Sequence, residues 1–292
     1  MIISNLIGGL GNQMFQYACA RALSLRTRQP LRLATDQFDS YQQHNGFELL
    51  RVFDLNVPQA TREELVSHLG MQAHPKVRRL LGRPSMRWAT GKKWCNEPSF
   101  DYWPGIRNVG HPAYLHGYWQ SERYFAEVVD VIRNDFTFRG DFDMLDLAVR
   151  DRMASAPCAS LHVRRGDYLK GKFKSVYASC DVSYYVEAVQ LLRKKFPYIN
   201  LFAFSDEPEW VKKYLEPEIG YVEIINHNVD TRSSNDMRLM STANYHIIAN
   251  SSFSWWAAWL NPSPDKIVIS PRHWFLNGTN DTDLIPSSWI RL

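Results

Sequence analysis

The stretch His162-Val163-Arg164-Arg165-Gly166-Asp167-Tyr168 follows the apolar run Ala159-Ser160-Leu161, which predicts a buried strand. Two adjacent arginines and a carboxylate therefore stand where this strand ends. Ligands of open α/β sheets bind at the carboxyl ends of the strands, and a guanidinium group pairs with two phosphate oxygens at once. The stretch indicates an α/β fold with a site for an anionic ligand. The alternative is an exposed Arg–Asp pair on a loop, which carries little energy.

After Pro157 the sequence alternates between short apolar runs and segments with helical periodicity. This alternation predicts a mostly parallel, doubly wound sheet. We expect strands at residues 159–163, 200–204, 221–225 and 267–269, and helices at 183–196, 208–215, 235–248 and 251–260.

The beginning of the chain has the same strand and helix order. Residues 1–7 are apolar, Gly8-Gly9-Leu10-Gly11-Asn12-Gln13 follows, and apolar residues then recur at helical spacing before a second strand at 31–34. Glycines let the backbone approach a ligand closely, and a helix start favours an anion. The alternative is a plain tight turn. We expect two Rossmann-like domains, at residues 1–152 and 153–292.

The first glycines also raise the possibility of a nicotinamide-dependent oxidoreductase. Gly9-x-Gly11 after one strand and Asp36 after the next resemble a dinucleotide fingerprint. Met14 stands in place of the third glycine, where a bulky side chain hinders close packing of helix and strand. The match is weak, and this function is kept as an alternative.

Three features stand out in the rest of the first half. Residues 61–69 predict a helix with a capping box at Thr61, and residues 121–133 predict another helix. Residues 114–120 combine aromatic and amide side chains that suit sugars, although aromatic side chains more often belong to a core. The abundant tryptophan and tyrosine of the chain leave a non-catalytic glycan-binding module as a further alternative. The basic stretch from Lys76 to Lys93 is either a solvated helical face or a patch for anionic lipid.

Composition excludes several classes of protein. The 292 residues carry a net charge of only +4, which is too mild for nucleic acid as the main partner. The four cysteines are far apart and predict neither a zinc site nor disulfides. We find no signal peptide and no apolar run that could span a bilayer, and expect a cytoplasmic protein. The aspartate pairs Asp141/Asp143 and Asp281/Asp283 do not follow strands, so we interpret them as structural rather than metal-binding.

Polar residues end three strands of the second half, and we expect them on one edge of the sheet. Serines at a helix start can bind phosphate, an aspartate can accept from a base or ribose, and a histidine can contact the base. No Gly-x-x-x-x-Gly-Lys is present, so the pattern predicts a nucleotide diphosphate site without a P-loop, and two domains facing a cleft as in GT-B transferases. The candidate binding residues of this half are His162, Arg164, Arg165, Ser205, Asp206, Asn250, Ser251, Ser252 and Phe253.

Five blocks in order make the chain similar to glycosyltransferase family 11, which contains the α-1,2-fucosyltransferases. They are residues 8–18, Gly117-Tyr118-Trp119-Gln120-Ser121, the stretch 162–168, Phe204-Ser205-Asp206, and residues 250–260. The resemblance spans nearly the whole chain and is weakest over residues 41–110. It implies GDP-fucose as donor, a galactose hydroxyl as acceptor, inversion at the fucose anomeric carbon, and no metal.

The resemblance also implies roles for individual residues. Arg164 would neutralise the charge that grows on the leaving β-phosphate. Arg165 would orient Asp167 or pack the motif, and Ser251 and Ser252 would hold the diphosphate. Candidates for the general base are Asp36 and Asp167, and a bound water could substitute. In the first domain, the residues that would approach the diphosphate or the fucose are Gly9, Gly11 and Asn12.

The missing membrane anchor resembles bacterial members, which act in the cytoplasm on surface-glycan precursors. The acceptor implied is a galactose-terminated oligosaccharide or lipid-linked glycan, such as an O-antigen precursor. Peripheral contact with the cytoplasmic face of the inner membrane would then accompany catalysis.

Overall fold

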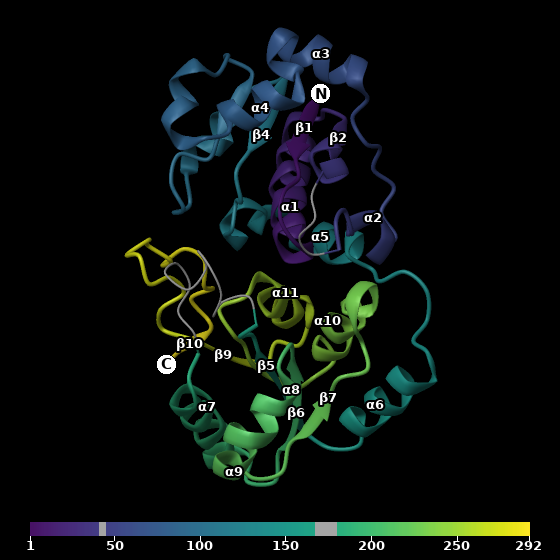
Figure 1. Ribbon diagram of the computed structural model, residues 1–292, viewed down its shortest axis with the longest axis vertical. Coiled ribbons are helices and arrows are strands. Elements are labelled where there is room, and N and C mark those ends of the chain that lie inside the picture. Colours follow the sequence, from purple (N-terminus) through teal and green to yellow (C-terminus); the bar gives the residue numbers. More distant parts are fainter. Residues whose placement is uncertain (41–44, 167–179) are drawn as a thin grey trace. The chain divides into compact units, whose positions relative to one another are not determined.

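The computed structural model describes residues 1–40, 45–166 and 180–292 and forms two compact units (Figure 1). Unit 1 contains Met1–Arg139 and Thr282–Leu284, and unit 2 contains Gly140–Asp281 and Ile285–Leu292. The division lies before helix α6 (Met144–Ala154), whereas the boundary expected at 152/153 lies inside it. The reason is that α6 is bound to unit 2 through the buried Asp146, which accepts three hydrogen bonds from residues 227–235.

Unit 1 is built on a four-stranded parallel sheet in the order β2-β1-β4-β3. The first strand is central, and its apolar residues Ile2 and Ile3 are fully buried. Helix α1 (Leu10–Thr27) follows β1 after the glycines, as predicted. The strands are β1 (Ile2–Asn5), β2 (Leu31–Ala34), β3 (Trp94–Asn96) and β4 (Ala113–His116).

The other helices of unit 1 are short. The capping box predicted at Thr61 is present at the start of α3: the Thr61 side chain accepts the N–H of Glu64, and the Glu64 carboxylate accepts the N–H of Thr61. The α-helices are α2 (Leu49–Val52), α3 (Arg62–Leu69), α4 (Pro75–Leu81) and α5 (Val129–Asp135), and the 3-10 helices are η1 (Asp36–Ser40), η2 (Gly70–Ala73), η3 (Pro84–Ala89), η4 (Pro104–Asn108), η5 (Glu122–Tyr124) and η6 (Ala126–Val128).

Unit 2 is built on a six-stranded parallel sheet in the order β10-β9-β8-β5-β6-β7. The predicted α/β class with parallel sheets is therefore confirmed. The strands are β5 (Cys158–Val163), β6 (Asn200–Ser205), β7 (Glu223–Ile225), β8 (Tyr245–Ile247), β9 (Ile267–Ser270) and β10 (Ile290–Arg291).

Helices cover both faces of this sheet (Figure 1). On one face Leu161 and Val163 of β5 pack with buried residues of α7, η8 and α9. The other face carries α10 and α11. Trp255 and Trp256 of α11 are fully buried. The helical segments are α7 (Val182–Lys195), α8 (Pro208–Trp210), the π-helical η8 (Val211–Leu215), α9 (Glu216–Ile219), η9 (Asp230–Arg232), α10 (Ser234–Met240) and α11 (Ser252–Leu260).

The helix expected at 235–248 is wrong in its second half. Helix α10 ends at Met240, and Tyr245–Ile247 forms strand β8 between β5 and β9. Aromatic and β-branched side chains suit a pleated strand, and hydrogen bonding to two neighbours decides the conformation here. The helical periodicity of the sequence did not reveal these long-range pairings.

The helix expected at 121–133 is also interrupted. Residues 122–128 form the turns η5 and η6, and regular helix begins only at Val129. Phe125 has φ −131° and is fully buried, with its ring 6.4 Å from that of Phe15 on α1. Burying this ring against α1 breaks the helical path.

Three of the four paired aspartates accept backbone N–H groups. Asp143 caps α6 by accepting the N–H of Asp146 at 2.9 Å. Asp281 accepts the N–H of Trp274 at 2.7 Å, and Asp283 accepts the N–H of Tyr102 at 3.0 Å. All four cysteines are free thiols.

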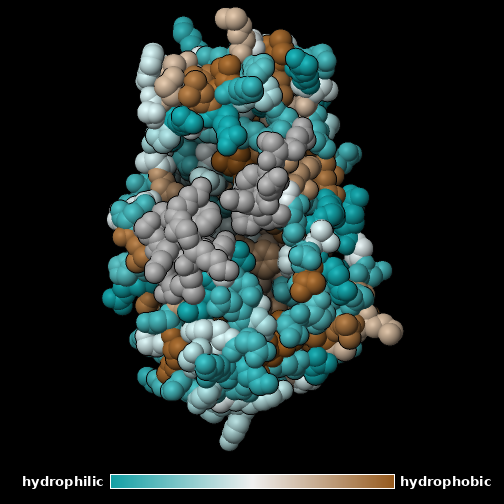
Figure 2. All heavy atoms as spheres, viewed as in Figure 1, coloured by the Kyte–Doolittle hydropathy of each residue, from teal (hydrophilic) through white to brown (hydrophobic). Residues whose placement is uncertain are grey.

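The basic stretch 76–93 is not a uniformly solvated face. Arg78 is buried and makes an ion pair with Asp36, whereas Lys76, Arg79 and Arg83 are exposed. On the face drawn in Figure 2, hydrophilic side chains predominate and the apolar ones lie in small separate groups. No helix in the described part of the chain is long and apolar enough to cross a membrane.

Candidate functional site

The predicted ligand residues of unit 2 gather at the point where its strand order reverses. From β5 the chain adds β6 and β7 on one side of the sheet, and then β8, β9 and β10 on the other. Loops after the two strands at such a switch point diverge and leave a crevice for a ligand. Residues 164–166 follow β5, and residues 248–251 follow its neighbour β8. The sequence analysis predicted the site at these two loops and at the end of a third strand, with Ser205 and Asp206.

The turn after β5 is held by the Asp206 carboxylate, which follows β6. One oxygen accepts the N–H of Arg165 at 3.0 Å, and the other accepts the N–H of Gly166 at 3.1 Å. The second oxygen also lies 3.3 Å from Nε of Arg164. We expected Asp206 to receive donors from the nucleotide, whereas in the structure both of its oxygens fix the arginine turn. This arrangement limits the freedom of the Arg164 side chain, which is 29% exposed.

Arg165 occupies a more enclosed place than Arg164. Its guanidinium carbon lies 4.0 Å from the centre of the Trp210 ring, and its Nε lies 3.4 Å from a carboxylate oxygen of Glu207. Stacking of this kind stabilises the packing of neighbouring elements. The geometry supports a packing role for Arg165.

We therefore expect Arg165→Lys to reduce stability more than catalysis. Lysine keeps the charge but loses the planar group on Trp210, at a cost of about 1 kcal/mol. For a unit of this size, a loss of that order lowers the melting temperature by about 2–4 °C. Thermal denaturation and steady-state kinetics measure the two effects. A large loss of kcat with an unchanged melting temperature would contradict the packing role.

His162 points to the face of the sheet that carries α11. Its ring centre lies 5.8 Å from that of Phe253 in the first turn of α11. Burial lowers the pKa of His162 to about 3, so the imidazole is neutral near pH 7. Its Nδ1 has no hydrogen-bond partner among the residues that the structure describes. Buried polar atoms are normally hydrogen-bonded, so this Nδ1 is available to a group of a bound ligand.

The residues after β8 begin helix α11. Ser251 is the N-cap, and its Oγ accepts the N–H of Phe253 at 3.3 Å. Asn250 is fully buried and donates to the carbonyl of Trp274 at 3.1 Å. Ser205, at the end of β6, accepts the N–H of Glu207 at 2.9 Å. These side chains fix the loops at the switch point, and Ser252 opens the first turn of α11.

The candidates of unit 1 lie at the carboxyl ends of its strands. Gly8 has φ +79°, and Gly9 is the N-cap of α1. Gly11 is buried in the first turn of α1, next to Asn12, whose Oδ1 accepts a hydrogen bond from Nε2 of Gln120 at 2.6 Å. These contacts were not foreseen from the glycine pattern.

The two candidates for the general base are Asp36 and Asp167. Asp36 begins the turn after β2, and one of its oxygens pairs with Arg78, whose side chain is fully buried. Asp167, like Tyr168, lies outside the described residues.

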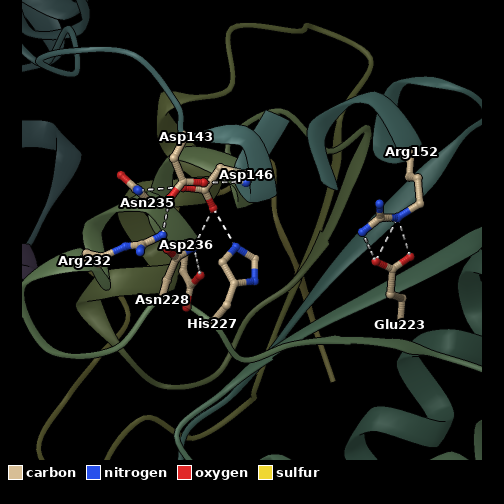
Figure 3. Close-up of polar contacts among 9 residues, drawn as sticks. All are labelled: Asp143, Asp146, Arg152, Glu223, His227, Asn228, Arg232, Asn235 and Asp236. Atoms are coloured by element: carbon tan, nitrogen blue, oxygen red, sulfur yellow. Dashed lines mark hydrogen bonds and ion pairs between the residues drawn. The ribbon is translucent and has the colours of Figure 1, made fainter. Parts of the chain in front are cut away.

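A buried polar network beyond β7 was missed by the sequence analysis (Figure 3). Asp146 of α6 is fully buried and accepts hydrogen bonds from His227 at 2.9 Å, Asn228 at 2.8 Å and Asn235 at 2.6 Å. Asn228 also donates to Asp236 at 2.9 Å. The network joins the start of α6, the loop after β7 and the start of α10, all on the carboxyl side of the sheet.

The network brings the carboxyl groups of Asp146 and Asp236 close together. Burial raises the pKa of Asp236 to about 7, with a further contribution from the nearby Asp146 carboxylate. Asp143 and Arg232 form an ion pair at its exposed side. The polar residues His227 and Asn228 directly after a strand were the signal in the sequence that could have drawn attention to this loop. In the described ranges 1–40, 45–166 and 180–292, no three histidine, cysteine or acidic side chains group as metal ligands.

The sequence of this chain matches one family of known proteins. A family model described as glycosyl transferase family 11 matches residues 100–285. The chain is 33% identical to an α-1,2-colitosyltransferase of Escherichia coli over 100% of this chain and 99% of that protein. It is 31% identical to the O-antigen biosynthesis glycosyltransferase WbnK of Escherichia coli over 99% of each.

A likeness to a solved structure supports the fold. The fucosyltransferase NodZ from Bradyrhizobium superposes with a TM-score of 0.54 at 14% identity, over 89% of this chain and 92% of NodZ. At this identity the likeness concerns the fold alone. It confirms the predicted fold class, that of the GT-B-type fucosyltransferases.

Proposed function

Because this chain belongs to glycosyltransferase family 11, we propose that it transfers L-fucose from GDP-fucose to the 2-hydroxyl of a terminal galactose, with inversion at the anomeric carbon. The observation that carries this proposal is the Arg164 turn, held by Asp206 at the switch point of unit 2. A guanidinium group fixed at this place suits a nucleotide diphosphate. The acceptor that we propose is a surface-glycan precursor, in keeping with the O-antigen role in the name of WbnK.

The reaction breaks the bond between fucose C1 and the oxygen of the β-phosphate while the galactose O2 forms a new bond to C1. Negative charge grows on the departing GDP, and Arg164 compensates it. The neutral His162, with its unpartnered Nδ1, is assigned to the guanine base. The loop with Asn250, Ser251 and Ser252 is assigned to the diphosphate.

The proton of the acceptor hydroxyl must leave as the new bond forms. Asp36 and Asp167 are the proposed bases, with water as the substitute. The ion pair with Arg78 occupies one oxygen of Asp36 and leaves the other without a hydrogen-bond partner among the described residues. From unit 1, we assign Gly9, Gly11 and Asn12 to the donor sugar and its phosphates.

Incubation with GDP-fucose and lactose, followed by linkage analysis of the product, tests this function. We expect a fucose attached to the 2-position of galactose through an inverted linkage. GDP at about 100 times its dissociation constant should also stabilise the protein by about 2.7 kcal/mol, whereas NAD should not. A product linked at another position would contradict the proposed regiochemistry. Stabilisation by NAD but not by GDP would favour the oxidoreductase.

A second donor deserves comparison because an α-1,2-colitosyltransferase is 33% identical to this chain. Colitose differs from fucose in lacking the 3-hydroxyl group. A site that hydrogen-bonds this hydroxyl rejects the sugar without it. Competition between GDP-fucose and GDP-colitose, with the product identified by mass, determines which sugar this enzyme prefers.

We expect the transfer to continue without a divalent metal, because Arg164 supplies the positive charge at the leaving group. Enzyme treated with EDTA and then desalted should keep its kcat. The assay is run with and without added manganese. Complete loss of activity that manganese restores would contradict this prediction.

A further inference from the structure

The sheet of unit 1 has a switch point of its own. From β1 the chain adds β2 on one side of the sheet, and the later strands β3 and β4 on the other. The reversal therefore lies between the neighbours β1 and β4. Residues 6–9 and the first turn of α1 follow β1, and the turn 117–120 follows β4. This is the place at which an open α/β sheet holds a ligand.

Two side-chain pairs join these neighbouring strand ends. Asn5 at the end of β1 bonds to Nδ1 of His116 at the end of β4, at 2.9 Å. Further out, Nε2 of Gln120 donates to Oδ1 of Asn12 at 2.6 Å. The two loops are thus held in a defined relation by polar side chains.

A buried carboxylate lies beneath the turn after β4. Glu97 follows β3 and is only 6% exposed. Its Oε2 accepts the N–H of Tyr118 at 2.7 Å, and its Oε1 accepts the N–H of Trp119 at 2.8 Å. Burial raises the pKa of Glu97 to about 7, and the two backbone N–H groups oppose that rise. Burial of the Glu97 carboxylate costs free energy, and the two hydrogen bonds from the backbone offset this cost.

The backbone of the turn depends on this contact. Trp119 has φ +55°, which is uncommon for a bulky residue. A Cβ at Gly117 would lie 2.4 Å from Cβ of Glu97, so only glycine permits the close approach. The Trp119 side chain is buried edge-on against Tyr124, with ring centres 5.3 Å apart. Tyr118, which lies between Gly117 and Trp119 in the sequence, is 42% exposed.

We propose that the switch point of unit 1 binds the galactoside acceptor, with Tyr118 stacking on the sugar ring and Glu97 acting as the positioning residue that holds the turn 117–120. The inference rests on the proposed function and names the acceptor residues within it. The exposed Tyr118 ring suits the apolar face of a hexose, and the amide groups of Asn12 and Gln120 join the two loops of the same switch point. Glu97 acts through the backbone N–H groups of Tyr118 and Trp119 and does not contact the sugar.

The variant Glu97→Gln tests the positioning role at nearly constant side-chain size. It removes the charge and places an amide N–H₂ against one of the two backbone donors. We expect the KM for lactose to rise about tenfold, which corresponds to about 1.4 kcal/mol. The KM for GDP-fucose, the melting-temperature shift produced by GDP, and GDP-fucose hydrolysis without acceptor should stay unchanged.

Two further variants make the test decisive. Tyr118→Ala should also raise the KM for lactose, because it removes the stacking ring without touching the buried carboxylate. Glu127→Gln is the matched control, since Glu127 is an exposed carboxylate of unit 1 whose partner is the equally exposed Arg107. It should leave every kinetic constant as in the wild type.

The outcomes separate this inference from the proposed function. A wild-type enzyme that transfers fucose, with an unchanged lactose KM in Glu97→Gln and Tyr118→Ala, overturns the inference alone. If Glu97→Gln does not fold, as judged by loss of GDP binding, the result with Tyr118→Ala decides. A wild-type enzyme that binds GDP but never transfers fucose or colitose overturns the proposed function instead.

Discussion

Arg164→Lys is expected to lower kcat by at least about 100-fold, with a much smaller change in the KM for GDP-fucose. Lysine keeps the positive charge but loses the planar group that forms two hydrogen bonds with phosphate at once. Removal of one preorganised donor to a developing charge costs on the order of 10²–10³ in rate. The loss should fall on kcat because the interaction strengthens as GDP departs.

Steady-state kinetics with varied GDP-fucose measure this effect, and Arg165→Lys is the matched control. Both changes remove one guanidinium group from the same motif, but Arg165 stacks on Trp210. Lysine at 164 should spare the melting temperature, whereas lysine at 165 should lower it. Kinetic constants of Arg164→Lys equal to those of the wild type would show that Arg164 is not the partner of the leaving group.

Asp146→Ala is expected to produce the largest loss of stability. The side chain is fully buried and accepts hydrogen bonds from His227, Asn228 and Asn235. Alanine leaves three donors without this acceptor. Asn228 is buried whereas His227 and Asn235 are partly exposed, and an unsatisfied buried group costs about 1–3 kcal/mol. Even a total of about 3 kcal/mol lowers the melting temperature of a unit of this size by about 6–12 °C.

The matched control is Asp151→Ala on the same helix. Asp151 pairs with its neighbour Arg150, and its side chain is 67% exposed, so the change should cost less than about 0.5 kcal/mol. Thermal denaturation of both variants measures the difference. Equal melting temperatures for Asp146→Ala and Asp151→Ala would show that the buried network does not stabilise unit 2.

Much of the fold could be predicted because the signals were local. The capping box of α3 and Asp143 at the start of α6 depend on residues three positions apart. The apolar run before Arg164 identified the central strand β5. Because the strands were predicted to be parallel, the ends of β5 and β6 were expected on one edge, which is where the structure has the turn with Asp206.

Other features depended on pairings between distant residues and could not be predicted. Strand β8 was assigned to a helix because its partners in β5 and β9 lie far away in the sequence. The boundary was expected inside α6, because the contacts that join this helix to unit 2, such as Asp146 with His227 and Arg152 with Glu223, link residues far apart in the sequence.

The sequence by itself determined the α/β class, the arginine turn and its likeness to one family of transferases, because these depend on residue order and local spacing. Only the tertiary structure decided the partners of those residues. Asp206 holds the arginine turn, Arg78 pairs with Asp36, and Glu97 lies beneath the turn 117–120. Each partner lies between 21 and 42 positions away in the sequence, and the sheet brings it into contact. The physical reason for Arg78 and Glu97 is that a buried charge must find its partners wherever the fold places them.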